Sequence, residues 1–69
     1  MDNKVYKLIE LTGTSKTSVE EAVQAAITEA AKTVRNMSWF QVTETRGALK
    51  DGKVDQWQVT LKVGFRIES

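Results

Sequence analysis

Alternating apolar and polar residues near the start of the chain predict a β-strand. Over residues 4–11, Val5, Ile9 and Leu11 fall on one face of an extended backbone, while Tyr6 and Glu10 fall on the other. The following residues, 12–16, are threonine, glycine, serine and lysine, and this composition predicts a turn. We therefore expect a first strand over residues 4–11 that leads directly into another element.

The next segment has the three-and-four spacing of an amphipathic helix. Its apolar stripe consists of Val19, Ala22, Val23, Ala26, Ile27, Ala30, Ala31 and Val34. Much of the stripe is alanine, so the helix can lie close against a sheet. Thr17 with Glu20 has the spacing of a capping box, and so does Ser18 with Glu21; either start gives nearly the same helix. Asn36 marks its expected end.

The rest of the chain predicts a β-hairpin. Two strand-like runs cover residues 37–50 and 53–67, and Asp51-Gly52 between them is typical of a type I′ turn. The second run alternates, with one face formed by Val59, Leu61, Val63, Phe65 and Ile67. The pattern therefore predicts an α+β fold of the order β-α-β-β, with a three-stranded antiparallel sheet, in a single domain over residues 1–69.

The turn also predicts the register of the hairpin. Counting outward from Lys50 opposite Lys53 pairs Phe40 with Val63, Val42 with Leu61, and Glu44 with Val59, which aligns the apolar residues toward the helix. Trp39 then lies on the opposite face, across from Gly64. A glycine in that position leaves the indole ring open to a flat partner.

The same register places Gln58 opposite Thr45, on the face that carries Trp39. Gly64, the partner of Trp39, lies about 20 Å along the strand from Gln58 at about 3.3 Å per residue. One small ligand can contact both side chains only if they come from neighbouring subunits. A β-bulge in either strand would change this parity.

Each of these residues also has a simpler interpretation. A tryptophan on the second face of a small sheet is more often buried in an oligomer interface than used as a ligand platform. A glutamine in a strand is more often simply solvated, and spacing alone marks Arg46 as a surface arginine. Trp57 falls on the helix side, near the hairpin end, where it would pack at the margin of the core.

Chain length and composition favour self-association. A chain of 69 residues forms only a small core, and such scaffolds usually need disulfides, a metal or partner subunits. The sequence has no cysteine and no histidine, which excludes disulfides and zinc sites of the Cys/His type. Association with further copies of the chain is the remaining route to stability.

Charge and hydropathy exclude other classes of protein. The net charge is +1, with both signs interspersed, whereas nucleic-acid binders normally carry a basic face or arm. No apolar stretch can span a bilayer, and the N-terminus lacks the apolar core of a signal peptide, so we expect no membrane partner and a cytoplasmic location.

The sequence offers no catalytic machinery. Without histidine or cysteine, and with no base beside its serines, the chain has no nucleophile and base of the triad type. No glycine-rich phosphate-binding loop is present. We therefore expect no enzyme, no catalytic residue and no metal site.

Several segments together resemble the dodecin family in order and spacing, over nearly the whole chain. These segments are Val5-Tyr6-Lys7, Lys32-Thr33-Val34-Arg35-Asn36, Trp39-Phe40, Glu44-Thr45-Arg46-Gly47, Asp51-Gly52-Lys53 and Gln58-Val59-Thr60-Leu61-Lys62-Val63-Gly64-Phe65-Arg66. The resemblance implies a sheet curved around one helix and a hollow shell of twelve identical subunits. It also implies a protein that binds flavin in pairs between subunits, for storage and protection without turnover.

The resemblance implies specific roles for five residues. Trp39 would stack on the isoalloxazine ring and quench its photochemistry, and Gln58 would hydrogen-bond the polar edge of that ring. Bacterial-type members prefer flavin mononucleotide (FMN) and also bind coenzyme A, so the resemblance implies FMN or riboflavin as the flavin and coenzyme A as a further ligand. Arg46 is the candidate for the phosphate-bearing tail, and Arg66 and Tyr6 are candidates for coenzyme A contacts.

One departure and one alternative remain. Trp57 stands where the family commonly has tyrosine, with its ring turned away from the flavin face, so we expect altered packing and the same ligand class. The alternative is a structural homo-oligomer or protein-interaction module in which the Trp39 face is only a subunit interface.

Overall fold

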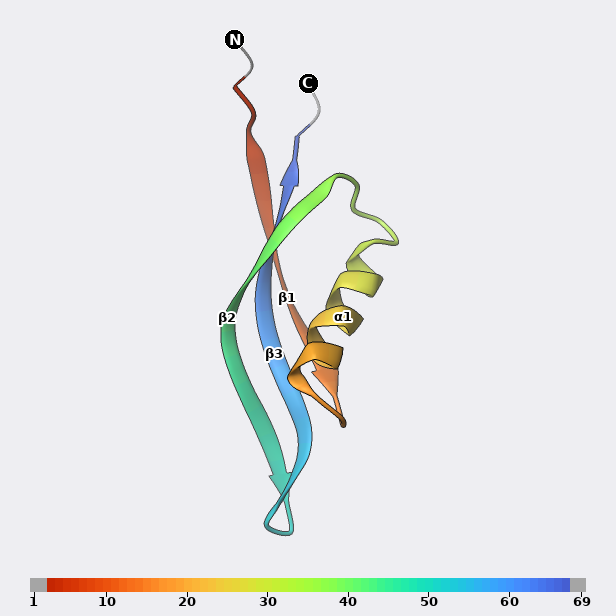
Figure 1. Ribbon diagram of the computed structural model, residues 1–69, viewed down its shortest axis with the longest axis vertical. Coiled ribbons are helices and arrows are strands. Elements are labelled where there is room, and N and C mark those ends of the chain that lie inside the picture. The colour runs from red at the N-terminus through yellow and green to blue at the C-terminus, as the bar shows by residue number, and fades with distance from the viewer. Residues whose placement is uncertain (1–2, 68–69) are drawn as a thin grey trace.

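The computed structural model describes residues 3–67 and has the element order β-α-β-β (Figure 1). The elements are β1 (Tyr6–Ser15), α1 (Val19–Ala30), β2 (Met37–Lys50) and β3 (Lys53–Arg66). Both neighbours of β3 run antiparallel to it, so the sheet has the order β1-β3-β2. The predicted fold class is confirmed, and β3 is the central strand.

The first strand is longer than the sequence predicted. Residues 12–15 continue β1 and stay paired with β3, from Thr12 opposite Thr60 to Ser15 opposite Trp57. The hydroxyls of Thr12 and Thr60 also hydrogen-bond each other at 2.9 Å. The predicted turn over these residues is wrong because β3 is long enough to pair with them, and threonine suits a strand as well as a turn.

Ser18 caps the N-terminus of α1, which decides between the two capping alternatives. Its Oγ accepts a hydrogen bond from the backbone N–H of Glu21 at 3.1 Å. Ser15, the last residue of β1, supports the cap: its hydroxyl donates to Glu21 Oε1 at 3.1 Å and accepts from the N–H of Thr17 at 2.9 Å. The strand end and the helix start are therefore joined by side-chain hydrogen bonds.

The helix ends earlier than the apolar stripe suggested. Its last residue is Ala30, whereas the stripe continued to Val34. After Ala30 the backbone tightens, because the N–H groups of Lys32 and Thr33 bond carbonyls three residues back. Asn36 then takes a left-handed conformation with φ of 64°, and its carbonyl accepts from the N–H of Arg66 at 3.1 Å. The chain thus leaves the helix and enters β2.

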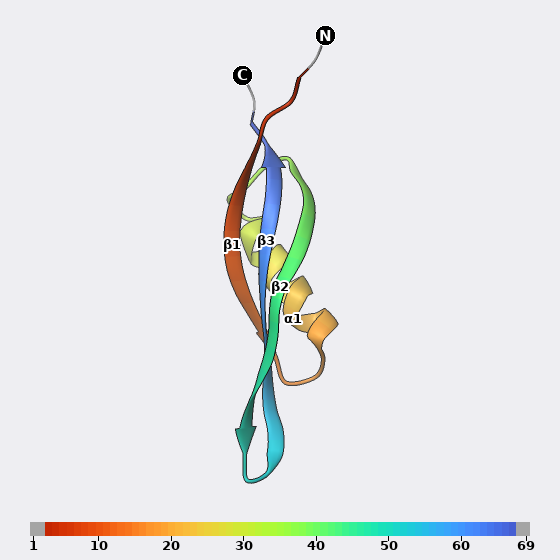
Figure 2. The ribbon, with the colours of Figure 1, turned by 90° about the vertical axis from the view of Figure 1, so that its left-hand side faces the viewer.

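The helix packs on β1 and β3 and covers one face of the sheet (Figure 2). Its buried residues are Ala22, Ala26 and Ala30, and those of β3 on this face are Val59, Leu61 and Val63. The fit depends on small residues. A Cβ at Gly13 would strike the carbonyl oxygen of Ala22 and lie 3.1 Å from the Cβ of Ala26, so only glycine allows the helix to approach this closely.

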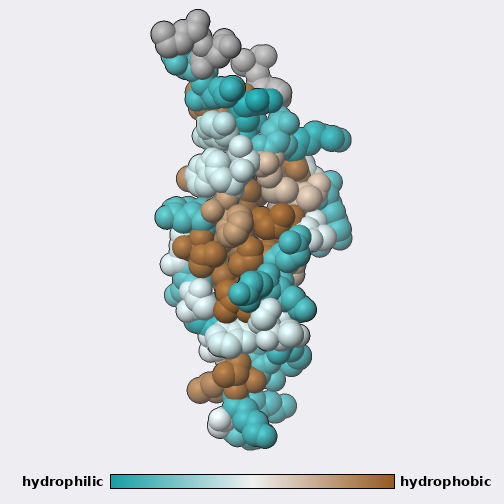
Figure 3. Space-filling model, in the orientation of Figure 1, coloured by the Kyte–Doolittle hydropathy of each residue, from teal (hydrophilic) through white to brown (hydrophobic). Residues whose placement is uncertain are grey.

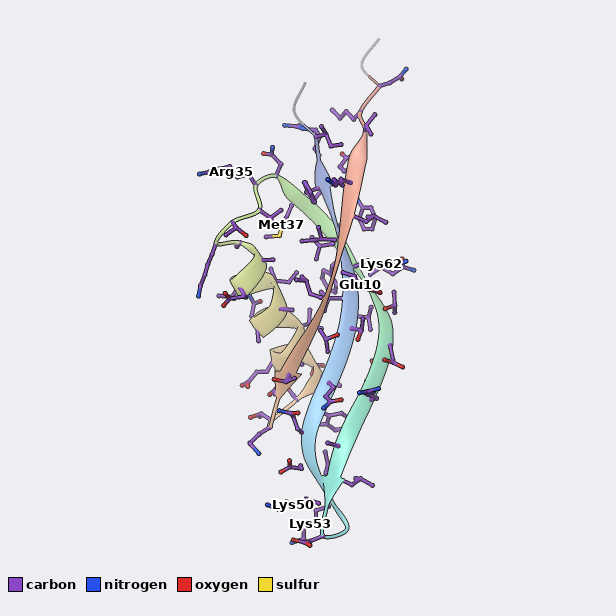
Figure 4. The ribbon with its side chains drawn as sticks, turned by 180° about the vertical axis from the view of Figure 1, so that it is seen from behind. Glu10, Arg35, Met37, Lys50, Lys53 and Lys62 are labelled. Carbon is purple, nitrogen blue, oxygen red and sulfur yellow. The ribbon has the colours of Figure 1, made fainter. Side chains whose placement is uncertain are left out.

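The hairpin turn forms as predicted. Asp51 and Gly52 both have positive φ, at 53° and 75°, which a type I′ turn requires. Lys50 and Lys53 pair across it and lie together at the tip (Figure 4). The hairpin tip extends well beyond the N-terminal end of α1 (Figure 1).

The predicted register is right beside the turn and from Trp39 to Val42, wrong between these two stretches, and shifted again at Met37, which pairs with Phe65. Trp39 lies opposite Gly64, and Phe40 opposite Val63, as expected. Glu44, however, pairs with Thr60 instead of Val59, and Gln58 pairs with Arg46 instead of Thr45. The sequence-based pairings of Glu44 and Gln58 are therefore corrected by one residue.

Two bulges cause this shift. Irregularities lie between Val42 and Glu44 and between Ala48 and Leu49; the first leaves Thr43 unpaired in β2, and the second leaves Asp55 unpaired in β3. Because they fall on opposite strands, the second offsets the first. Thr43 donates its hydroxyl to the carbonyl of Thr60 at 3.2 Å, and Asp55 forms a surface ion pair with Lys16 at 3.3 Å. Both extra residues thus have partners of their own.

The chain is strongly elongated. Its extents are 56 × 21 × 13 Å and its radius of gyration is 14.5 Å. A compact chain of this length would have a radius of gyration of about 11 Å. Much of the sheet therefore lies outside the small core beneath the helix.

Candidate functional site

Trp39 lies against the backbone of Gly64 on the face of the sheet away from the helix. A Cβ built on Gly64 would meet the indole atoms Cε2 and Cζ2 and lie 2.8 Å from Nε1. The indole itself occupies the space that glycine leaves, which the sequence did not show. Trp39 is still 45% exposed, so part of its ring remains available to a further aromatic partner.

An apolar groove borders Trp39 on its other side. The groove has a volume of about 540 Å³ and is open between the helix and the start of β2. Its apolar walls are Val19, Val23 and Ile27 of the helix and Met37, Trp39 and Phe40 of β2. Figure 3 shows hydrophobic residues gathered in the middle of the molecular surface, surrounded by more hydrophilic residues. As part of an edge strand, Trp39 lies at the outer face and also lines this groove.

Gln58 belongs to a chain of three polar side chains. Arg46 donates from Nε to Gln58 Oε1 at 2.8 Å, and Gln58 donates from Nε2 to Gln56 Oε1 at 3.1 Å. The bulge at Thr43 makes this possible, because it turns Arg46 to the same face as Gln58. Arg46 is exposed, whereas both glutamines are half-buried.

Sequence reasoning missed Gln56. It lies two residues before Gln58 on β3, and alternate residues of a strand share a face. That spacing could have indicated that Gln56 and Gln58 lie side by side. The hydrogen bond between Gln58 and Arg46 could not be predicted from the sequence, because it depends on the bulge.

Arg66 and Tyr6 are brought together by the pairing of β1 with β3. They are direct cross-strand partners, and with Asn36, Met37 and Ser38 they line a small depression of about 210 Å³. Leu8, on the same face of β1, is opposite Gly64, the partner of Trp39. Tyr6 and Arg66 therefore lie at the Trp39 end of the sheet.

The five candidate residues therefore share the face away from the helix but form two separate groups. Trp39, Arg66 and Tyr6 lie at one end, and Gln58 with Arg46 lies toward the hairpin tip. Gly64 and Gln58 are six positions apart on β3, about 20 Å at 3.3 Å per residue. The expected intrachain separation of Trp39 and Gln58 thus persists despite the bulges.

Between the two groups the face is polar and charged. Lys62 of β3 lies between Glu10 of β1 and Gln41 of β2, its cross-strand partners. The side chains of Glu10 and Lys62 lie close together in this region (Figure 4). Opposite charges in such a cross-strand position are mildly stabilising.

Trp57 is on the helix side, as predicted, and is half-buried opposite Gly47 and Ser15.

Within residues 3–67, no group of three or more His, Cys, Asp or Glu side chains lies where it could bind a metal ion. Over the same residues, no helix has the length and hydropathy of a membrane span.

The fold and this face define a small β-α-β-β protein with an exposed tryptophan at a glycine-lined position on the outer surface of its sheet. The family model named Dodecin matches residues 5–68 of the chain. The chain belongs to the dodecin family.

Individual relatives agree with this assignment. The chain is 51% identical to the dodecin of Thermus thermophilus over 65 residues, which cover 94% of each protein. It is 48% identical to the solved dodecin of Streptomyces coelicolor, with a TM-score of 0.94 over 100% of this chain and 99% of that one. A more distant match, at 34% identity, is a calcium dodecin of Mycobacterium tuberculosis, described as having a novel calcium-binding site; its TM-score is 0.80, over 93% of this chain and 91% of that one.

Membership carries a general function. Dodecins are small flavin-binding proteins and are generally not enzymes. Dodecin homologues form homo-oligomers.

Proposed function

We propose that this protein stores FMN, or riboflavin, and quenches its photoreactivity, with the flavins stacked between Trp39 side chains of neighbouring subunits in a hollow assembly of twelve copies. The observation that carries the proposal is the half-exposed indole of Trp39 against Gly64. Offset stacking on an aromatic ring contributes about 0.5–1.5 kcal/mol beyond the area it buries.

Gln58 supports the proposal through its chemistry and its position. A glutamine amide offers one donor group and one acceptor, which suits the N–H and C=O groups along the pyrimidine edge of a flavin. Its distance from Trp39 along β3 excludes one chain supplying both contacts to one ring. Two chains can supply them if the outer faces of their sheets meet.

Exposed apolar side chains of β2 support assembly independently of the flavin. Phe40, which lines the groove, and the nearby Val42 are 51% and 40% exposed in the single chain. Apolar surface of this kind commonly marks a protein interface. A homo-oligomer covers such surface, which fits the membership in a family whose members associate.

Flavin emission tests the proposal directly. Titration of FMN or riboflavin into the assembled apoprotein is expected to quench flavin fluorescence, because stacked indole donates an electron to the excited ring. Trp39→Ala should weaken binding by roughly ten-fold or more, the equivalent of about 1.4 kcal/mol, since it removes both stacking and buried area. Trp57→Phe is the matched control, because Trp57 lies on the helix side.

Two results would contradict the proposal. No quenching by an assembled wild-type sample would remove the flavin function. A Trp39→Ala variant that falls apart into small species by light scattering, while the wild type shows no flavin binding, would favour a purely structural oligomer whose Trp39 face is only an interface.

Arg66 and Tyr6 are proposed to contact coenzyme A at the Trp39 end of the sheet. Their pairing places a cationic and an aromatic side chain beside one depression, and this combination suits a ligand that carries phosphates and a purine ring. Calorimetric titration with coenzyme A is expected to show binding by the wild type and weaker binding by Arg66→Gln. Equal heats from both proteins would rule out this contact.

A further inference from the structure

The amide of Gln58 is held at both of its ends. Arg46 Nε approaches Oε1 at 2.8 Å from β2, and Nε2 approaches the Oε1 of Gln56 at 3.1 Å on the same strand. A single hydrogen bond leaves a terminal amide free to rotate, whereas two bonds at opposite ends fix its plane. The sequence and the resemblance gave Gln56 no role, so its contact with Gln58 needs an explanation of its own.

The direction of this chain of hydrogen bonds follows from the chemistry of arginine. A guanidinium carries five N–H donors and no acceptor, so it can meet only the oxygen of the Gln58 amide. The NH₂ group of Gln58 is then turned toward Gln56, which must present its own oxygen. If the Gln58 amide were rotated by 180°, its NH₂ group would face the N–H donors of Arg46. The contact with Arg46 therefore determines which side of the amide carries the oxygen and which carries the nitrogen.

We propose that Gln56 is a positioning residue that fixes the orientation in which Gln58 presents its acceptor and donor to the polar edge of a flavin ring. This inference rests on the proposed flavin function. The amide oxygen keeps one lone pair and the NH₂ group one N–H beyond the two bonds described. The ring N–H therefore meets Oε1 on the Arg46 side, and the neighbouring ring carbonyl meets Nε2 on the Gln56 side.

The same geometry sharpens the role of Arg46. Its Nε is occupied by Gln58, which holds the guanidinium beside the amide. Its other N–H groups are not used in this bond, so Arg46 both orients Gln58 and adds positive charge beside its amide. Gln56 acts only through Gln58.

A ligand pair separates positioning from a merely structural effect. Riboflavin has an N–H at ring position N3, and 3-methylriboflavin lacks it, so the ratio of their dissociation constants measures recognition of that group. The wild type should prefer riboflavin by about ten-fold, and Gln56→Met, of similar length but with only a weakly accepting sulfur in place of the amide oxygen, should reduce this ratio by about three-fold. A general loss of stability would weaken both ligands equally and leave the ratio unchanged.

Two controls make the result specific. Gln56→Glu keeps an acceptor oxygen and is expected to retain the wild-type ratio. Thr12→Val removes a side-chain hydrogen bond from the same face of the sheet, the one to Thr60, without touching the Gln56–Gln58–Arg46 chain, and it should also retain the ratio. An unchanged ratio in Gln56→Met would overturn the proposal.

Ligand-free crystal structures distinguish this inference from the flavin function. Displacement of the Gln58 amide in Gln56→Met, relative to its place in the wild type, shows that Gln56 fixes the amide, whether or not the wild-type protein quenches flavin. If the wild type quenches no flavin, the proposed function fails and only the fixing of the amide by Gln56 stands. An amide that stays bonded to Arg46 in the same plane after the substitution overturns the role of Gln56, whatever the wild type binds.

Discussion

At the scale of single residues, Trp39 and Gly64 depend on each other. The indole occupies the space above the backbone where any side chain at position 64 would begin. The position of the ring is therefore determined by the absence of a Cβ as much as by the tryptophan. The strand pairing that aligns them is among the parts of the hairpin register that the sequence predicted correctly.

Gly64→Ala is expected to displace the indole and to weaken flavin binding by roughly ten-fold or more, since the stacked geometry is lost. The added Cβ would overlap Cε2 and Cζ2 of Trp39. Fluorescence titration measures the effect. Gly47→Ala is the matched control, because its Cβ would be 3.3 Å from the carbonyl oxygen of Gln56 and needs only a small adjustment. Equal affinities for the two variants would contradict a role for the Gly64 contact.

Arg46 and Gln58 show where residue-level prediction stopped. Residue types and the resemblance nominated both side chains, but strict alternation from the hairpin turn paired Gln58 with Thr45. Their hydrogen bond depends on the unpaired Thr43, and threonine is an ordinary strand residue that does not signal a bulge. The contact with Arg46 therefore could not be inferred from spacing, whereas the spacing of Gln56 and Gln58 on β3 did place those two side chains on one face.

At the scale of elements, the strand and helix types were predictable and several of their ends were not. The Asp51-Gly52 turn and the alternation in β3 fixed the hairpin, since both signals are local. The extension of β1 over residues 12–15 depends on partners in β3 that are distant in sequence. The early end of α1 likewise reflects the route of the backbone into β2, which the apolar stripe does not report.

The helix cap offers a direct test at this scale. Ser18→Ala is expected to lower the free energy of unfolding by about 1 kcal/mol, because the N–H of Glu21 loses its acceptor. Thr17→Ala, one residue earlier, should have a much smaller effect, since the side chain of Thr17 has no capping bond to α1. Thermal unfolding followed by circular dichroism compares the two. A larger loss in Thr17→Ala would mean that the helix starts in the other register.

At the scale of the whole molecule, the elongated shape and the apolar groove describe a chain that leaves much of its apolar surface uncovered. The buried core is confined to the region beneath α1, while Phe40, Val42 and Trp39 remain 40–51% exposed. Small cores alone supply only about 3–5 kcal/mol. Family membership and the shape of the chain thus both favour the proposal that association contributes to stability.

Phe40→Glu is expected to disrupt assembly, because a charge would be placed in the groove beside Val23 and Ile27. Light scattering should report a shift to smaller species. Leu49→Glu makes the same change near the hairpin tip, at a residue that is 73% exposed and outside the groove, and it should leave the size unchanged. Intact assemblies from both variants would mean that the groove is not a subunit interface.

The extended form of the chain, at 56 Å in its longest dimension, has a consequence for how the protein loses its structure. If folding is completed by neighbours, then the equilibrium obeys mass action, and the midpoint of heat unfolding must fall as the sample is diluted. Flavin binding across subunits would shift that midpoint upward by coupling to the same equilibrium. A dilution series, with and without ligand, would then measure association and binding together, because the stability of such a protein depends on its concentration.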